Sequence, residues 1–365
     1  MKISILTMHF AENYGAQLQA YGLQTYLQSI GYNVEILDFR PSKLITDYKM
    51  VNFKSFKKII SDCLRLRTRK KQVHKFKDFM NRYLNLSSEQ YDDTLSKKTF
   101  INTSDIFICG SDQIWNLPLT GYSYQYFLDF IDEKKHKKIS YAASFGDSIQ
   151  EKDKESMESY LGTFDAVSVR ENSSMNIIST ITNKDCLCVL DPVFLLNSDH
   201  WRNLSCYDTN LKPQSYILLY DLIGRGDKVL IKKAKIEAKR LNLKIVSIHP
   251  LTTKRYGADY NLCDVGSEEF LWLIDNAALV CTNSFHATSF SLIFEKGLIV
   301  NHRKGKFSRT KALLELFNME YINEISEIPG VGIQYINKEN QKILEEEIRK
   351  SVSFIKNSIG TEKYE

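Results

Sequence analysis

Polar side chains interrupt an apolar stretch near residue 286, and their types suit the binding of a ligand. Residues 281–290 read Cys-Thr-Asn-Ser-Phe-His-Ala-Thr-Ser-Phe, with apolar runs on both sides. Asn283 and Ser284 are residue types that cap helices, so His286 falls in the first turn of a predicted helix that ends near Gly297. Helix N-termini favour anions, and open α/β sheets bind ligands at this edge. The corner is therefore predicted to be a ligand site, and a capped helix with a half-buried histidine is the alternative.

Two further polar corners follow predicted strands in the first half of the chain. One reads Asn13-Tyr14-Gly15-Ala16-Gln17, and the other reads Gly110-Ser111-Asp112-Gln113. Glycine permits a close approach to the backbone, and the helix that follows offers free N–H groups. Both corners are therefore candidate binding sites, with Trp115 as a candidate sugar platform. An ordinary tight turn and a capping carboxylate are the alternatives.

Arg170 comes directly after another predicted strand and precedes Glu171. Arginine presents a rigid fork of donors that suits carboxylate and phosphate groups, which ligands place at such strand ends. Arg170 is therefore a candidate ligand-binding residue. An ion pair with Glu171 or Asp191 is the alternative.

These corners require strands and helices to position them, and the apolar pattern predicts two α/β series. The predicted strands of the first series are 2–7, 33–38, 104–109, 139–143, 166–169 and 187–190, with helices at about 16–30 and 151–161. The predicted elements of the second series are strands 216–220 and 244–248, helices 228–241 and 267–276, and the unit around His286. Successive β-α-β units predict parallel sheets. The fold class is therefore α/β, with two Rossmann-like domains, residues 1–191 and 192–365, facing across a cleft.

Composition describes a soluble globular protein in which 43% of the 365 residues are hydrophobic and 25% are charged. The amino terminus has no signal-peptide pattern and no run of ~18 apolar residues exists, so we expect a cytoplasmic location. The seven cysteines are scattered, which predicts reduced thiols.

Several familiar catalytic and cofactor motifs are incomplete or missing. Gly224-Arg225-Gly226 lacks the third glycine and the later acid of a dinucleotide fingerprint. No G-x-S-x-G motif occurs, and the lone Cys186-x-Cys188 pair is poor metal spacing. We therefore expect no metal and no cofactor.

Residues 54–82 form a strongly basic segment, with eleven Lys and Arg residues against Asp62 and Asp78. Apolar residues recur at helical spacing, which predicts a pair of basic amphipathic helices inserted at about 53–84. A solvated face is one interpretation, and attraction to an anionic partner is the other, whether lipid head groups, a diphosphate-linked substrate or nucleic acid. The aromatic residues lie on the apolar stripe and no binding motif is present, so nucleic acid is not expected as a partner.

Six motifs together resemble the polysaccharide pyruvyl transferase family, in order from about residue 7 to residue 310. They are Asn-Tyr-Gly-Ala-Gln-Leu-Gln-Ala-Tyr, Gly-Ser-Asp-Gln-Ile-Trp-Asn, Tyr-Ala-Ala-Ser-Phe-Gly, Ser-Val-Arg-Glu-Asn, Asp-Pro-Val-Phe-Leu-Leu and Thr-Asn-Ser-Phe-His-Ala-Thr. The resemblance implies a GT-B-like fold, phosphoenolpyruvate as co-substrate and a sugar or lipid-linked oligosaccharide as acceptor. The product would be a pyruvate ketal in capsule, exopolysaccharide or cell-wall polymer biosynthesis.

This implied reaction needs an acid, a base and fixed positive charge. We assign His286 as acid and base, Arg170 as the clamp for the donor's charges, and Asp112 as the base for the acceptor hydroxyl. The expected substrate-binding residues are Asn13, Tyr14, Gly15, Gln17, Gly110, Ser111, Gln113, Ser144, Asn283, Ser284, Phe285 and Arg309.

The chain departs from the family pattern at one position. Many family members have Arg-Leu-His where this chain has Ser284-Phe285-His286. Either the basic residues of the next loop replace that arginine, or the donor differs; the candidates are Arg303, Lys304, Lys306 and Arg309. Two other functions fit the implied fold: a GT-B glycosyltransferase that uses a nucleotide sugar, and a non-catalytic glycan-binding protein.

Overall fold

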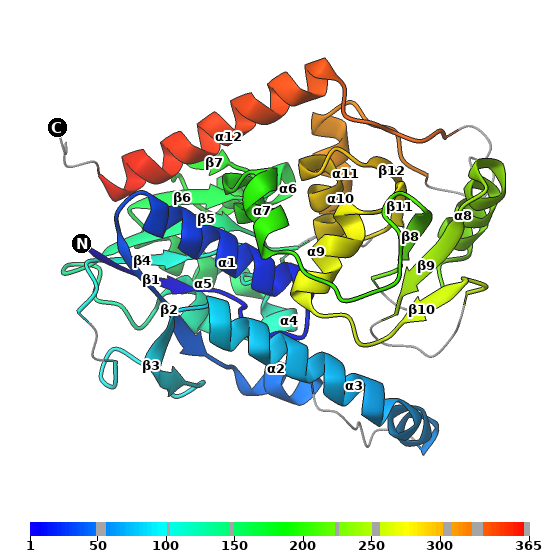
Figure 1. The fold of residues 1–365 in the computed structure, drawn as a ribbon. Helices are drawn as coiled ribbons and strands as arrows, with labels where there is room; N and C mark the ends of the chain where they lie inside the picture. The colour runs from blue at the N-terminus through cyan, green and yellow to red at the C-terminus, as the bar shows by residue number, and fades with distance from the viewer. Residues whose placement is uncertain are drawn as a thin grey trace. The chain divides into compact units, whose positions relative to one another are not determined.

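The chain forms two compact units in a computed structural model, shown in Figure 1. The structure describes residues 1–48, 56–100, 103–146, 149–222, 226–249, 256–301, 308–322 and 331–360, with the side chains of 56–64 and 308 excepted. Unit 1 holds residues 1–48, 80–196 and 344–365, and unit 2 holds residues 49–79 and 197–343. Each unit is built around a parallel sheet.

The sheet of unit 1 has seven strands in the order β3-β2-β1-β4-β5-β6-β7, and every neighbouring pair is parallel. The strands are β1 (Lys2–Leu6), β2 (Asn33–Phe39), β3 (Leu86–Tyr91), β4 (Ile106–Cys109), β5 (Lys137–Ala143), β6 (Ala166–Val169) and β7 (Cys186–Cys188). The central strands are buried on both faces: β4 is wholly apolar, and β1 is buried from Ile3 to Leu6, including the polar Ser4. The chain reverses its direction of sheet growth between β1 and β4, so the switch point lies there.

Helices and 3-10 turns pack around this sheet, and aromatic residues of its core gather around Trp115. The helices are α1 (Tyr14–Ser29), α2 (Ser42–Asp47), α4 (Leu117–Thr120), α5 (Lys154–Gly162) and α6 (Asn172–Ile181), with 3-10 turns η1 (Tyr124–Phe127), η2 (Glu151–Asp153) and η3 (Pro192–Leu195). Trp115 is fully buried, stacks on Phe127 with ring centroids 5.2 Å apart, and donates from Nε1 to Tyr126 O. The predicted role of Trp115 as a sugar platform is therefore wrong, because its ring belongs to the core.

The sheet of unit 2 repeats the same plan with five parallel strands in the order β10-β9-β8-β11-β12. The strands are β8 (Tyr216–Tyr220), β9 (Lys244–Ile248), β10 (Tyr260–Leu262), β11 (Leu279–Thr282) and β12 (Gly297–Val300). The helices are α7 (Ser198–Leu204), α8 (Lys228–Leu241), α9 (Ser267–Asp275), α10 (Phe285–Ile293) and α11 (Ser308–Leu316). The switch point of this sheet lies between β8 and β11, so both units present the same kind of edge.

The basic segment forms one helix, α3 (Phe56–Tyr83), where a pair of helices was predicted. The correction has a simple cause: no proline or glycine occurs between residues 56 and 83, so nothing in the sequence breaks the helix. The start of the predicted insertion, residues 53–55, lies outside the described residues.

The compact units differ from the predicted domains at their boundaries. The first unit extends to Leu196, and it also includes residues 344–365, which hold most of the last helix, α12 (Lys338–Ile359). Long-range contacts explain this grouping, since Ser351 Oγ accepts from Leu190 N at 3.0 Å and Lys137 Nζ donates to Ser358 O at 2.9 Å. Figure 1 shows α12 running beside β6 and β7.

The close packing of α1 on η3 generates a stability prediction. A Cβ atom added at Gly22 would lie 2.8 Å from Pro192 O, which is backbone and cannot easily move aside. We expect Gly22→Ala to lower the free energy of unfolding by about 1–3 kcal/mol. Gly162→Ala in α5 is the matched control, because its Cβ would meet nothing within 4 Å. Urea unfolding of both variants checks this, and an equal effect of the two substitutions would contradict the packing argument.

Candidate active site

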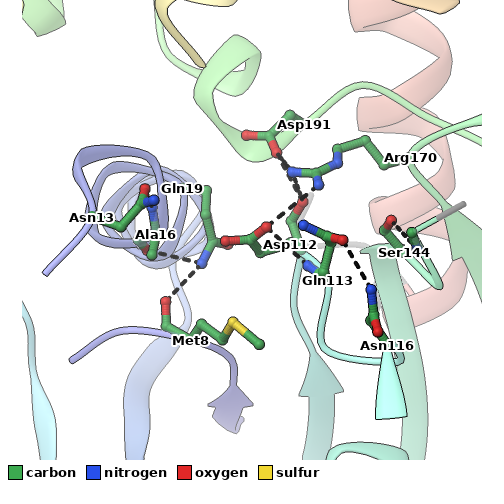
Figure 2. A network of polar contacts seen from close by, with 12 residues as sticks. Met8, Asn13, Ala16, Gln19, Asp112, Gln113, Asn116, Ser144, Arg170 and Asp191 are labelled. Atoms are coloured by element: carbon green, nitrogen blue, oxygen red, sulfur yellow. Dashed lines mark hydrogen bonds and ion pairs between the residues drawn. The ribbon is translucent and has the colours of Figure 1, made fainter. Parts of the chain in front are cut away.

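Polar side chains gather at the carboxyl ends of the strands that flank the switch point of unit 1. Thr7, which follows β1, joins the two predicted corners: its Oγ1 donates to Ser111 O at 3.0 Å and accepts from Gln19 Nε2 at 2.9 Å. Figure 2 shows Gln19 also donating to Met8 O and Ala16 O, at 3.2 and 2.9 Å. The corner after β1 and the corner after β4 are therefore one hydrogen-bonded structure.

The first corner is held mainly by burial. Asn13 is the N-cap of α1, and its Oδ1 accepts from Ala16 N at 3.2 Å. Tyr14, Gly15 and Gln17 are buried within the first turn of this helix. The structure thus places all four predicted residues near the switch point. Asn13 is partly exposed, and the other three are buried.

The second corner carries an unusual backbone conformation at Asp112. Its φ angle is +74°, in the left-handed region that non-glycine residues seldom adopt and that often marks functional sites. Gly110 allows the chain to approach β1, because a Cβ there would lie 2.9 Å from Thr7 Cβ. Asp112 O accepts from Ser144 N at 3.1 Å, and Asp112 Oδ1 accepts from Gln113 N at 2.9 Å. The turn therefore fixes the Asp112 carboxylate beside the end of β5.

Arg170 lies at the centre of a buried charge cluster, shown in Figure 2. Its side chain is 1% exposed, and its nitrogens lie 2.8 Å from Asp191, 3.5 Å from Asp112 and 3.9 Å from Glu171. Ser111 Oγ donates to the same Asp191 oxygen at 2.9 Å. Burial opposes the charge, but the three carboxylates outweigh it and raise the pKa of Arg170. The structure therefore contains the ion pair that was the alternative interpretation of Arg170.

The remaining predicted residues of unit 1 lie close to this cluster. Gln113 Oε1 accepts from Asn116 Nδ2 at 3.0 Å, and Ser144 Oγ accepts from Gly146 N at 3.0 Å. Ser111, Asp112, Gln113, Ser144 and Arg170 are thus brought to one edge of the sheet. Their meeting follows from the parallel topology, which places the carboxyl ends of β4, β5 and β6 side by side.

A second charged cluster after β1 was not predicted from the sequence. His9 is fully buried, with Nδ1 3.1 Å from Thr7 O and Nε2 2.9 Å from Asp38 Oδ1. Arg40 donates to the same carboxylate at 2.6 and 2.8 Å. Burial opposes ionisation of Asp38, but the hydrogen bonds and charges of His9 and Arg40 outweigh it and lower its pKa. The cluster holds the loop that precedes the first corner. Asp38 and Arg40, two charged residues at the end of β2, are the feature of the sequence that could have indicated it.

In unit 2, the predicted corner follows β11 and begins α10. Ser284 is the N-cap, with its Oγ accepting from Ala287 N at 3.4 Å. His286 lies in the first turn and is 8% exposed, with its ring edge-on to Phe285 at 5.1 Å between centroids. The structure therefore places His286 at a helix N-terminus beside the switch point, as the sequence predicted.

Asn283 belongs to a buried network that ties together three strand ends. Its Nδ2 donates to Asp221 Oδ1 at 2.9 Å, directly after β8. Asp227, the N-cap of α8, accepts from Asn301 Nδ2 at 2.6 Å, directly after β12. Asp221 in turn accepts from Asp227 N at 3.0 Å. These two aspartates and Asn301 were not predicted as site residues, because each is a single polar residue outside any recognisable motif.

Cationic side chains near this corner are only partly described. Arg309 lies in the first turn of α11 and is half-buried. Arg303, Lys304 and Lys306, the other candidates for the missing family arginine, lie outside the described residues, as does the Gly224-Arg225 pair.

Two further searches cover the described part of the chain. No group of three or more His, Cys, Asp or Glu side chains there could hold a metal ion. None of the helices described is both long enough and apolar enough to cross a membrane.

The chain matches one family model and shares its fold with solved structures. The model, described as polysaccharide pyruvyl transferase, matches residues 13–300. A Listeria monocytogenes protein described as a candidate UDP-N-acetylglucosamine 2-epimerase aligns with a TM-score of 0.50 and 12% identity, over 97% of this chain and 87% of that one. The S. aureus MnaA–UDP co-structure aligns with a TM-score of 0.51 and 10% identity, over 98% and 96%. No functionally curated protein is significantly similar in sequence. The fold is GT-B, with two Rossmann-like units.

The charge cluster predicts an asymmetry between two substitutions. Arg170→Met would leave buried carboxylates without a cation, so we expect it to cost about 3–5 kcal/mol in unfolding free energy. Asp191→Asn should cost less, because Asp112 and Glu171 still face the guanidinium. Arg202→Met is the control, since the Arg202 side chain is 43% exposed beside Asp275 and should cost under about 1 kcal/mol.

Thermal and urea unfolding at neutral pH measure the three variants. A cost for Asp191→Asn that equals or exceeds that of Arg170→Met would show that the cluster does not depend on its cation.

Proposed function

We propose, because the chain belongs to the polysaccharide pyruvyl transferase family, that it transfers a pyruvyl group from phosphoenolpyruvate to two hydroxyls of a sugar. The observation that carries this proposal is that the family match spans the polar corners at both switch points. The product is a pyruvate ketal on a saccharide or lipid-linked precursor of a capsule, exopolysaccharide or cell-wall polymer. Phosphoenolpyruvate is a cytoplasmic metabolite, so the proposed reaction takes place in the cytoplasm.

The reaction consists of an addition to the double bond of phosphoenolpyruvate followed by a substitution at the same carbon, C2. A proton adds to the methylene carbon of phosphoenolpyruvate while a sugar hydroxyl attacks C2 and loses its own proton. A second hydroxyl then displaces phosphate, which leaves with the remaining proton. The enzyme must therefore supply an acid, a base and donors for the oxygens that carry negative charge.

His286 is the residue we assign to proton transfer at the donor. It stands in the first turn of α10, directly after β11, where the free N–H groups of the helix can hold a phosphate. Imidazole can give and accept a proton near neutral pH, so one side chain can serve both half-reactions. Ser284 stands where many family members have arginine, and Arg309 is the described cation we propose to replace it.

Asp112 is the residue we assign as base for the acceptor hydroxyl. Its carboxylate is 14% exposed, whereas those of Asp191 and Glu171 in the same cluster are almost completely buried. Its left-handed backbone fixes the direction of that side chain. We propose that Arg170 acts mainly by holding this carboxylate, because three acidic side chains already face its guanidinium.

The reaction itself is tested with purified protein, phosphoenolpyruvate and a panel of lipid-linked and soluble sugars. We expect release of inorganic phosphate that depends on the acceptor, together with a pyruvyl gain in the mass of that acceptor. Release of UDP or another nucleotide from a nucleotide sugar, without phosphate release from phosphoenolpyruvate, would support a glycosyltransferase instead. Binding of sugar without either release would indicate a non-catalytic protein.

Substitution of His286 tests its assignment. We expect His286→Ala to lower kcat by about 100-fold or more, since it removes a positioned acid and base. The melting temperature should stay within a few degrees, because α10 keeps its N-cap, Ser284, and the other buried residues of its first turn. His200→Ala is the matched control, a histidine of α7 in the same unit that no proposed step uses. A kcat of His286→Ala close to that of His200→Ala would contradict the assignment of His286.

A further inference from the structure

We propose that the outward face of α3 binds the surface of an anionic phospholipid membrane. This inference rests on the charge and burial of the helix and does not depend on the identity of the donor or the acceptor. The outward face is defined here by its exposed basic residues, which are Arg67, Lys70, Lys71, His74, Lys77 and Arg82.

These residues lie on one side of the helix because of their spacing. Steps of three and four residues separate Arg67, Lys70, His74 and Lys77, which is the period of a single helical face. Lys71 and Arg82 flank the same line. From Arg67 to Lys77 the helix rises about 15 Å, so the charges form a straight row.

The opposite side of α3 is fixed against the protein. Val73, Phe76, Phe79 and Met80 are buried, and Gln72 Nε2 donates to Val265 O at 3.4 Å. Lys75, at the border between the two sides, pairs with Glu269 at 2.7 Å. The apolar side of the helix is therefore packed against the protein, and its charged side faces solvent.

Few acidic side chains offset the row. His74 lies 3.3 Å from Asp78, and Lys71 lies 4.0 Å from Asp264. Within the described residues, no acidic side chain pairs with Arg67, Lys70 or Lys77. The row therefore keeps a net positive charge.

A lipid surface matches this row better than a nucleic acid does. The aromatic residues Phe76 and Phe79 are buried, so neither ring is available to stack on bases. Between Arg67 and Lys77 the exposed side chains are polar or charged, so contact there would be electrostatic and without insertion. Each Lys or Arg close to such a surface contributes about fivefold to binding at low salt, and the attraction decays within a Debye length.

Vesicle sedimentation with the full chain tests the proposal without donor or acceptor. Wild-type protein should bind vesicles of phosphatidylglycerol and phosphatidylcholine at low salt, dissociate at roughly 0.5 M NaCl, and ignore pure phosphatidylcholine. The variant Arg67→Gln, Lys70→Gln, Lys71→Gln, Lys77→Gln should bind at least about 100-fold more weakly, from four residues at about fivefold each. Circular dichroism and the melting temperature confirm that it folds.

Helix α8 supplies a matched control with the same loss of charge. Lys228, Lys232, Lys235 and Lys239 are exposed and also lie at helical spacing, so their replacement by Gln removes four cations from another helix of unit 2. We expect this control to keep most of the binding. Three results would overturn the proposal: no wild-type binding at low salt, equal losses in both variants, or tighter binding to RNA than to vesicles at the same salt. Failure here leaves the phosphate-release assay unaffected, so the two proposals fail separately.

Discussion

A buried guanidinium organises the edge on which the proposed chemistry depends. Arg170 follows β6, and its partners come from the corner after β4 and from Asp191 after β7. A single cation faces three carboxylates, so the cluster holds together only while the arginine is charged and in place. Asp112 is the partly exposed member, and its left-handed φ of +74° is tolerated because neighbours on both sides hold it.

The two units join the ends of their strands with different kinds of side chain. In unit 1, charge pairs join the strand ends, whereas in unit 2 amide groups of Asn283 and Asn301 join them to Asp221 and Asp227. Both networks lie at the switch point of a parallel sheet, the place where open α/β sheets generally bind ligands. Among the described residues of the second network, side-chain amides and backbone N–H groups donate to the two aspartates.

The sequence predicted the parts of the site that depend on strand ends. Parallel strands bring their carboxyl ends to one edge, so Asp112 and Arg170 were both expected at that edge, whereas the contact between them was not predicted. Whether Arg170 binds a ligand or pairs with an acidic side chain depends on distances between atoms in the folded chain. The spacing of residues in the sequence does not give these distances. Trp115 closely follows the polar corner Gly110-Ser111-Asp112-Gln113 in sequence, yet its ring is buried in the core, where it stacks on Phe127, twelve residues further along the chain. The grouping of α12 with unit 1 depends on Ser351 and Leu190, which are 161 residues apart.

In the proposed reaction, phosphoenolpyruvate is protonated at its methylene carbon and becomes a ketal. Mass spectrometry and proton NMR of the sugar product formed in D2O test this step. We expect a product that carries a pyruvate ketal, with one deuterium in each new methyl group, because one of its three hydrogens comes from solvent. An acceptor that gains a glycosyl unit, or a pyruvyl group whose methyl holds no deuterium, would contradict it.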